Sequence, residues 1–122
     1  RHQTFICTNR DRQAIELVMK PYQIELPRHQ IYSKDFNGEA VNMSNSKLEQ
    51  VHMIIEKTGG AEQAMVLIED QPELPGKLIQ QCPNLKVLYA AYGYGLEEDW
   101  ARLDSGAITR ITKPADLVYE LY

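Results

Sequence analysis

Short apolar runs of β type alternate with helical patterns along the chain, and this alternation limits the fold more than any other feature. The strand-like runs are residues 4–8, 30–33, 64–68, 86–91 and 108–112. The helical patterns lie around residues 14–19, 48–55, 74–81, 97–104 and 114–121. Strands that alternate with helices form βαβ units. We therefore expect a doubly wound α/β fold, with a mainly parallel sheet and helices on both faces.

Length and charge limit the classes of function. The 122 residues are predicted to form one α/β domain, residues 1–122. With 13 basic and 17 acidic residues the net charge is −4, which argues against a nucleic-acid partner or a polybasic membrane contact. No apolar run is long enough to span a bilayer. Cys7 and Cys82 form no paired motif, which favours a reducing, cytoplasmic location.

The most apolar run, residues 64–68, is typical of a central parallel strand buried on both faces. It ends in two adjacent carboxylates, Glu69 and Asp70. Carboxylates beside a core are costly to desolvate unless a cation or hydrogen-bond donors compensate. This pair is therefore a candidate metal or catalytic site.

Two further candidates follow from the position of ligands in such folds, at the carboxyl ends of the strands. Thr8 ends the first strand, and its hydroxyl is either a helix cap or a donor to an anion. Lys47 follows Ser46, which caps the next helix in a capping box with Glu49. Lys47 is either a solvated side chain or, with the helix N-terminus, an anion-binding group. Solvated charge is the default for Arg10 and Arg12.

Three segments, taken in order, resemble motifs two, three and four of the haloacid dehalogenase-like hydrolases. They are residues 4–10, Ser46-Lys47 and residues 66–70. The gaps between Thr8, Lys47 and Asp70 are similar to those of the family, and residues 85–117 resemble its later strands and helices. Their joint order supplies the specificity, and the resemblance implies a Rossmann-type sheet over nearly the whole chain.

The resemblance also implies a mechanism. In this family an Asp of an Asp-x-Asp-x-Thr motif attacks the phosphoryl group of a small phosphorylated substrate and forms an aspartyl-phosphate. By analogy, Mg²⁺ is held by that Asp and by Asp70. Thr8 donates to a phosphoryl oxygen, and Lys47 balances charge. Glu69 stands where the family more commonly has Gly, which implies a supporting role or a changed metal shell.

The nucleophile motif does not precede Thr8 in this chain. Residues 35–39 imitate it, but they follow motif two, and residues 31–34 before them read as too polar for a buried central strand. We therefore predict a loop turn there. The chain resembles the C-terminal part of the family core without its first central strand. As given, we expect weak Mg²⁺ binding and no phosphatase turnover.

An absent central strand leaves the strands that end at Thr8 and Ile68 with unpaired backbone groups, which favour pairing with another chain. We expect the gap to be closed by an upstream segment, by direct pairing or by self-association. We favour the upstream segment because residues 4–8 and 65–68 have the composition of strands inside a sheet. The start of the chain at Arg1 rather than Met also leads us to expect residues upstream.

Two other interpretations stay open. Lys113-Pro114 after the last strand resembles a response-regulator receiver domain, with Asp70 as phospho-acceptor. However, receivers carry acidic metal ligands where this chain has Thr8-Asn9-Arg10. The second interpretation is a catalytically dead binding module. Its contact face would consist of Tyr89, Tyr92, Tyr94 and Trp100. The simpler alternative places Tyr89 and Trp100 in the core.

Overall fold

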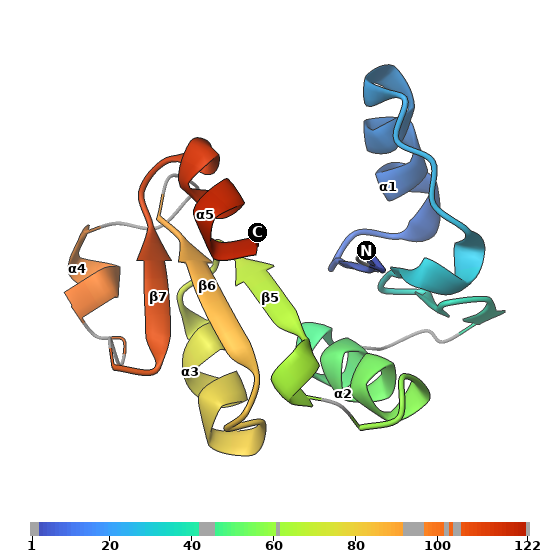
Figure 1. Ribbon diagram of the computed structural model, residues 1–122. Helices are drawn as coiled ribbons and strands as arrows, with labels where there is room; N and C mark the ends of the chain where they lie inside the picture. The colour runs from blue at the N-terminus through green and yellow to red at the C-terminus, as the bar shows by residue number, and fades with distance from the viewer. Residues whose placement is uncertain are drawn as a thin grey trace. The chain divides into compact units, whose positions relative to one another are not determined.

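The chain forms a mixed α/β structure of two compact units, Arg1–Gly59 and Gly60–Tyr122, each described by itself (Figure 1). The computed structural model describes residues 3–41, 46–60, 62–91, 97–101, 103 and 106–121. That the whole chain is one domain stays a prediction.

The first unit holds a small mixed sheet and two helices. Its elements are β1 (Ile6–Cys7), α1 (Arg12–Met19), β2 (Ile31–Tyr32), β3 (Phe36–Asn37), β4 (Ala40–Val41) and α2 (Lys47–Lys57). The strand order is β1-β2-β3-β4, with β1 parallel to β2 and the other pairs antiparallel. The expected strands at residues 4–8 and 30–33 are thus present, but each contains only two residues.

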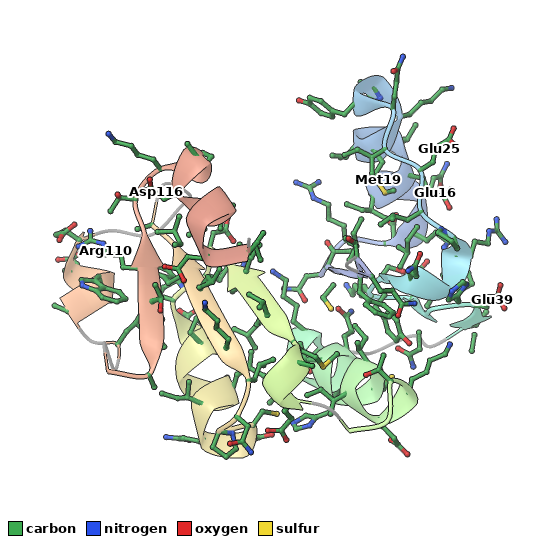
Figure 2. All side chains as sticks on the ribbon, viewed as in Figure 1. Glu16, Met19, Glu25, Glu39, Arg110 and Asp116 are labelled. Atoms are coloured by element: carbon green, nitrogen blue, oxygen red, sulfur yellow. The ribbon has the colours of Figure 1, made fainter. Side chains whose placement is uncertain are left out.

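A buried arginine organises the loops of this unit. Arg12 donates from Nη2 to the carbonyl oxygens of Arg28 (3.0 Å) and Gly38 (3.1 Å), and its guanidinium lies 4.8 Å from the ring centre of Phe36. It also lies 3.7 Å from the Glu16 carboxylate (Glu16 is labelled in Figure 2). The expectation of a solvated Arg12 is wrong, because its polar contacts lie in distant loops that local sequence does not reveal.

Residues 31–39 differ from the sequence prediction. Residues 31–34 were predicted to be too polar for a buried central strand. That prediction is wrong for Ile31 and Tyr32, which are buried and form β2 between β1 and β3, and Ser33 is buried as well. The buried hydroxyl of Ser33 has a hydrogen-bond partner nearby in the sequence, because it donates to Asp35 Oδ1 at 2.9 Å. The predicted loop turn is a hairpin, whose turn contains Gly38 at φ +67° between β3 and β4.

The second unit is a parallel sheet with order β5-β6-β7. Its elements are β5 (Val66–Glu69), α3 (Glu73–Gln81), β6 (Lys86–Ala90), α4 (Glu97–Ala101), β7 (Ile108–Ile111) and α5 (Leu117–Leu121). Each confirms an expected strand or helix, although residue 104, the expected end of α4, lies outside the described residues. The alternation of strand and helix is visible in Figure 1.

Helices contact both faces of this sheet. Tyr89 of β6 stacks on Trp100 of α4, with ring centres 5.9 Å apart. Lys86 of β6 pairs with Glu120 of α5 at 2.9 Å. Residues an odd number apart in a strand point to opposite faces, so α4 and α5 cover opposite faces. The core is apolar and includes, fully or nearly fully buried, Leu78, Cys82, Val87, Leu88, Ile108 and Ile111.

β5 is not the doubly buried central strand that its composition predicts. It lies at the edge of the described sheet, and Val66 and Ile68 remain 40% and 42% exposed. β6 is the central strand, and its residues from Val87 to Ala90 are all buried. A continuous apolar run therefore does not show whether a strand lies at the edge or in the centre of its sheet. Among the described helices, none is long and apolar enough to cross a membrane.

Candidate functional site

Thr8 follows β1 directly, and both its backbone N–H and its carbonyl form hydrogen bonds. Its N–H donates to the Tyr32 carbonyl at 3.0 Å, and its carbonyl accepts from Nε2 of Gln50 at 3.0 Å. Its hydroxyl oxygen accepts from the Arg10 N–H at 3.1 Å. That oxygen still carries its own proton, which it can donate to an anion.

The alternative in which Thr8 caps the following helix is wrong. The N-cap of α1 is Asp11, whose carboxylate accepts from the Ala14 N–H at 2.7 Å. Asp11 and Thr8 are both suitable capping types, and the sequence alone did not distinguish them. The Thr8 hydroxyl instead belongs to the turn that leaves β1.

Lys47 is the first residue of α2 and is half-buried. The preceding Ser46 is the predicted N-cap, and its hydroxyl oxygen accepts from the Glu49 N–H at 3.2 Å. Gln50, in the same first turn, binds the Thr8 carbonyl. The start of α2 and the end of β1 therefore meet within the first unit, so two of the three predicted catalytic residues lie on segments joined by one hydrogen bond.

Sequence reasoning missed Gln50. Its side chain is 0% exposed, although it is polar and lies near the start of a helix. The available signal is spacing, because Gln50 is four residues before Ile54 and therefore on the buried face of α2. A glutamine on an apolar stripe indicates a specific hydrogen-bond partner, but the partner, Thr8, is distant in sequence.

Glu69 and Asp70 lie at the carboxyl end of β5, in the second unit. Glu69 is buried, and its Oε1 accepts from the N–H groups of Asp70 and Gln71, both at 3.0 Å. The carboxylate therefore shapes the turn that carries Asp70, which is half-buried. These bonds supply the donors that a buried carboxylate requires. Glu69 as a metal ligand stays a prediction.

The predicted metal site has oxygen donors of the kind that Mg²⁺ prefers, in Asp70 and Glu69. The described part of the chain contains no group of three or more His, Cys, Asp or Glu side chains placed to hold a metal ion. Asp70 belongs to one unit and Thr8 and Lys47 to the other. The convergence of all three residues at one site stays a prediction.

The aromatic residues of the second unit form a packed layer. Tyr89 is buried against Trp100, which confirms the core alternative for Tyr89. Arg110 of β7 lies 5.4 Å from the Trp100 ring centre, and its Nη1 and Nη2 donate to the two carboxylate oxygens of Glu97 (Arg110 is labelled in Figure 2). Hydrogen bonds from Arg110 hold the pKa of Glu97 below its ordinary value. Tyr92 and Tyr94 lie outside the described residues.

Neither Cys7 nor Cys82 forms a disulfide bond. Cys7 lies in β1 opposite Tyr32, and Cys82 ends α3 in the core. Burial raises the pKa of both Tyr32 and Cys82, with a further contribution from the neighbouring Cys7 and Glu62, respectively. The raised pKa of Cys82 reduces its thiolate fraction, so burial does not activate that thiol as a nucleophile.

Comparisons of the chain with protein-family models, curated proteins and solved structures gave no match.

Proposed function

We propose that the chain supplies the phosphate- and magnesium-binding part of a haloacid dehalogenase-like phosphohydrolase, acting on a small phosphorylated substrate. The observation that carries the proposal is the 3.0 Å hydrogen bond from Gln50 to the Thr8 carbonyl. It holds the end of β1 against the first turn of α2. In the proposal, the hydroxyl of Thr8 and the ammonium of Lys47 bind one anion there.

In this proposal the phosphoryl oxygens receive a hydrogen bond from Thr8 and positive charge from Lys47. A cation at a helix N-terminus opposes the macrodipole by a few tenths of a kcal/mol. An anion at the same place interacts favourably with both the lysine and the helix. The half-buried position of Lys47 supports this role, because reduced solvent contact strengthens its interaction with a charged ligand.

Asp70 is the proposed magnesium ligand of the second unit, and Glu69 holds its turn through Oε1. Bound Mg²⁺ would neutralise charge on the transferring phosphoryl group. The sequence contains no Asp-x-Asp-x-Thr motif to act as nucleophile. We therefore propose that these 122 residues alone bind the ligands without turnover.

The doubly wound arrangement of the sheet is part of the same proposal. β1 pairs with β2 in parallel, and β5, β6 and β7 follow one another in a parallel sheet. We propose that each arrangement is part of a doubly wound sheet that a further strand completes. The exposed side chains of Val66 and Ile68 support the idea that β5 has additional cover in that complete sheet.

The test is titration of the full chain with inorganic phosphate and, separately, with Mg²⁺, followed by backbone amide NMR shifts. Thr8→Val and Lys47→Met should each weaken phosphate binding about tenfold, the effect of about 1.4 kcal/mol. Lys57→Met, at the other end of α2, is the matched control and should change nothing. Asp70→Asn should abolish the Mg²⁺ shifts. An unchanged phosphate affinity in both the Thr8 and the Lys47 variant would contradict the proposal. Robust phosphomonoester hydrolysis by the chain would also contradict it.

A receiver-like phospho-acceptor domain is the second candidate, favoured by one observation. Asp70 follows β5, Lys113 follows β7, and the two strands flank β6 in one parallel sheet. A small acyl-phosphate donor distinguishes the candidates. A stable phosphoryl adduct on Asp70, found by mass spectrometry and lost in Asp70→Asn, would favour the receiver.

A further inference from the structure

We infer that Gln50 is a positioning residue that sets the geometry between Thr8 and Lys47. The inference rests on the proposed phosphate site and names the residue that holds it together. Gln50 itself is not expected to touch the ligand.

The geometry comes from one buried side chain that connects two segments. Gln50 Nε2 donates to the Thr8 carbonyl at 3.0 Å, and the Gln50 N–H donates to the Ser46 carbonyl at 2.9 Å. The first bond holds the residue after β1, and the second closes the first turn of α2 behind Lys47. Gln50 therefore belongs to both halves of the proposed site.

Packing alone does not explain an amide at this position. Gln50 is 0% exposed, and its Oε1 accepts no hydrogen bond from the part of the chain that the structure describes. A buried acceptor without a donor is destabilising, and an apolar side chain of similar size avoids that cost. The Nε2 bond to Thr8 is the feature that such an apolar side chain lacks.

The bond to Gln50 completes the restraint of Thr8. The Thr8 N–H is already held by Tyr32, so the Gln50 bond fixes the second peptide group of Thr8. With both backbone groups held, the position of the hydroxyl depends mainly on one side-chain rotation. Lys47 starts the helix that carries Gln50. Loss of the amide should therefore loosen the spacing between hydroxyl and ammonium while both groups remain present.

The test compares two variants of the full chain, with inorganic phosphate as the probe. Gln50→Met keeps the length and volume of the side chain but removes the hydrogen bond. Thr58→Val is the matched control, because the Thr58 hydroxyl donates to the Ile54 carbonyl at 2.7 Å at the opposite end of α2. We expect Gln50→Met to weaken phosphate binding about tenfold and Thr58→Val to leave it unchanged. Equal affinity of Gln50→Met and the unchanged chain would overturn the inference.

A second readout separates this inference from the proposed function. Nuclear Overhauser contacts between the Gln50 side-chain amide and residues 8–9 should be present without phosphate and absent in Gln50→Glu, whose carboxylate has no proton to donate to Thr8. Absent contacts in the unchanged chain would overturn the positioning role, whatever the phosphate affinity. Present contacts with no phosphate binding would refute the proposed function, and with it this inference. Weaker binding in Thr58→Val equal to that in Gln50→Met would also overturn it, by showing that general helix stability controls the affinity.

Discussion

Different interactions stabilise the β-sheets of the two units. In Arg1–Gly59 the strands contain two residues each, and buried polar groups, Arg12, Ser33 and Gln50, connect the segments. In Gly60–Tyr122 the strands contain four or five residues, and the buried residues around β6 are almost all apolar. The first unit depends on directional contacts, whereas the second depends on removal of apolar surface from water.

This difference predicts where each unit is sensitive to mutation. Hydrophobic burial is non-directional and tolerates changes of shape better than changes of volume. A buried hydrogen-bond network fails when one partner is removed, because the remaining groups stay buried without a partner. We therefore expect the largest effect of a substitution in the apolar core of the second unit and smaller effects at the polar contacts of the first.

The largest effect is expected in the centre of the second unit. Leu88 is fully buried in β6, so Leu88→Ala should lower the free energy of unfolding by about 3 kcal/mol through lost burial and a cavity. Urea unfolding followed by fluorescence measures it, because Trp100 is the single tryptophan of the chain and lies in this unit.

The control for Leu88→Ala uses the paired position on the edge strand. Ile68 lies opposite Leu88 in the register of β5 and β6, but it is 42% exposed. Ile68→Ala should therefore cost less than about 1 kcal/mol. Equal losses for the two variants would contradict the edge position of β5 and the exposure of Ile68.

The sequence predicted the second unit well because its structure follows local periodicity. The runs at residues 86–91 and 108–112 became β6 and β7, and the pattern around Leu74 became α3. The error concerned β5, whose composition is that of a central strand although it lies at an edge. Strand position in a sheet depends on pairing between distant segments, and hydrophobic periodicity contains no information on that pairing.

A smaller effect is expected for the arginine that organises the first unit. Arg12→Lys keeps the charge, but an ammonium group lacks the planar fork that reaches the carbonyls of both Arg28 and Gly38. The unit should lose about 2 kcal/mol. Hydrogen exchange of the Ser33 N–H, which donates to the Phe36 carbonyl at 2.9 Å, should accelerate. The urea unfolding transition of the second unit, followed by Trp100 fluorescence, should not change. An equal loss of stability in that transition would show that the two units unfold together.

The first unit also shows which parts of a site local sequence can reveal. Lys47 was predicted at the start of a helix because the capping box of Ser46 and Glu49 is a local signal. The roles of Arg12 and Gln50 depend on partners 16, 26 and 42 residues away. Nothing in the neighbouring residues specifies those partners, so candidate residues can be predicted from the sequence but the contacts that hold them cannot.

Two glycines should give effects of opposite sign. Gly38 has φ +67°, and a Cβ there would lie 3.2 Å from the His29 carbonyl oxygen, so Gly38→Ala should destabilise the first unit by about 1–2 kcal/mol. Gly76 lies inside α3, and a Cβ there would meet no atom within 4 Å apart from its chain neighbours and the nearby backbone of α3, so Gly76→Ala should stabilise the second unit by about 0.5–1 kcal/mol. Ser33 amide exchange and Trp100 fluorescence report the two effects. Destabilisation by Gly76→Ala would show that α3 requires glycine for a reason other than backbone conformation.

The smallest effect concerns acid sensitivity of the first unit, through Asp35. Burial tends to raise the pKa of Asp35, but hydrogen bonds from the Arg12 N–H and the Ser33 hydroxyl, both at 2.9 Å, together with the Arg12 charge, hold it below its ordinary value. A carboxyl group whose pKa is lower in the folded state stabilises the fold above its unfolded pKa. That contribution is lost as the pH falls from about 4 through the folded pKa. Titration of the Asp35 carboxyl carbon by NMR should give a midpoint below the ordinary value of an aspartate, and Ser33 amide protection should decrease over the same pH range. Asp35→Asn keeps Oδ1 as acceptor and should remove this pH dependence, whereas Glu97→Gln in the second unit should leave it intact. A normal Asp35 midpoint with unchanged protection would indicate that the turn after β2 is held by Arg12 without help from the carboxylate charge.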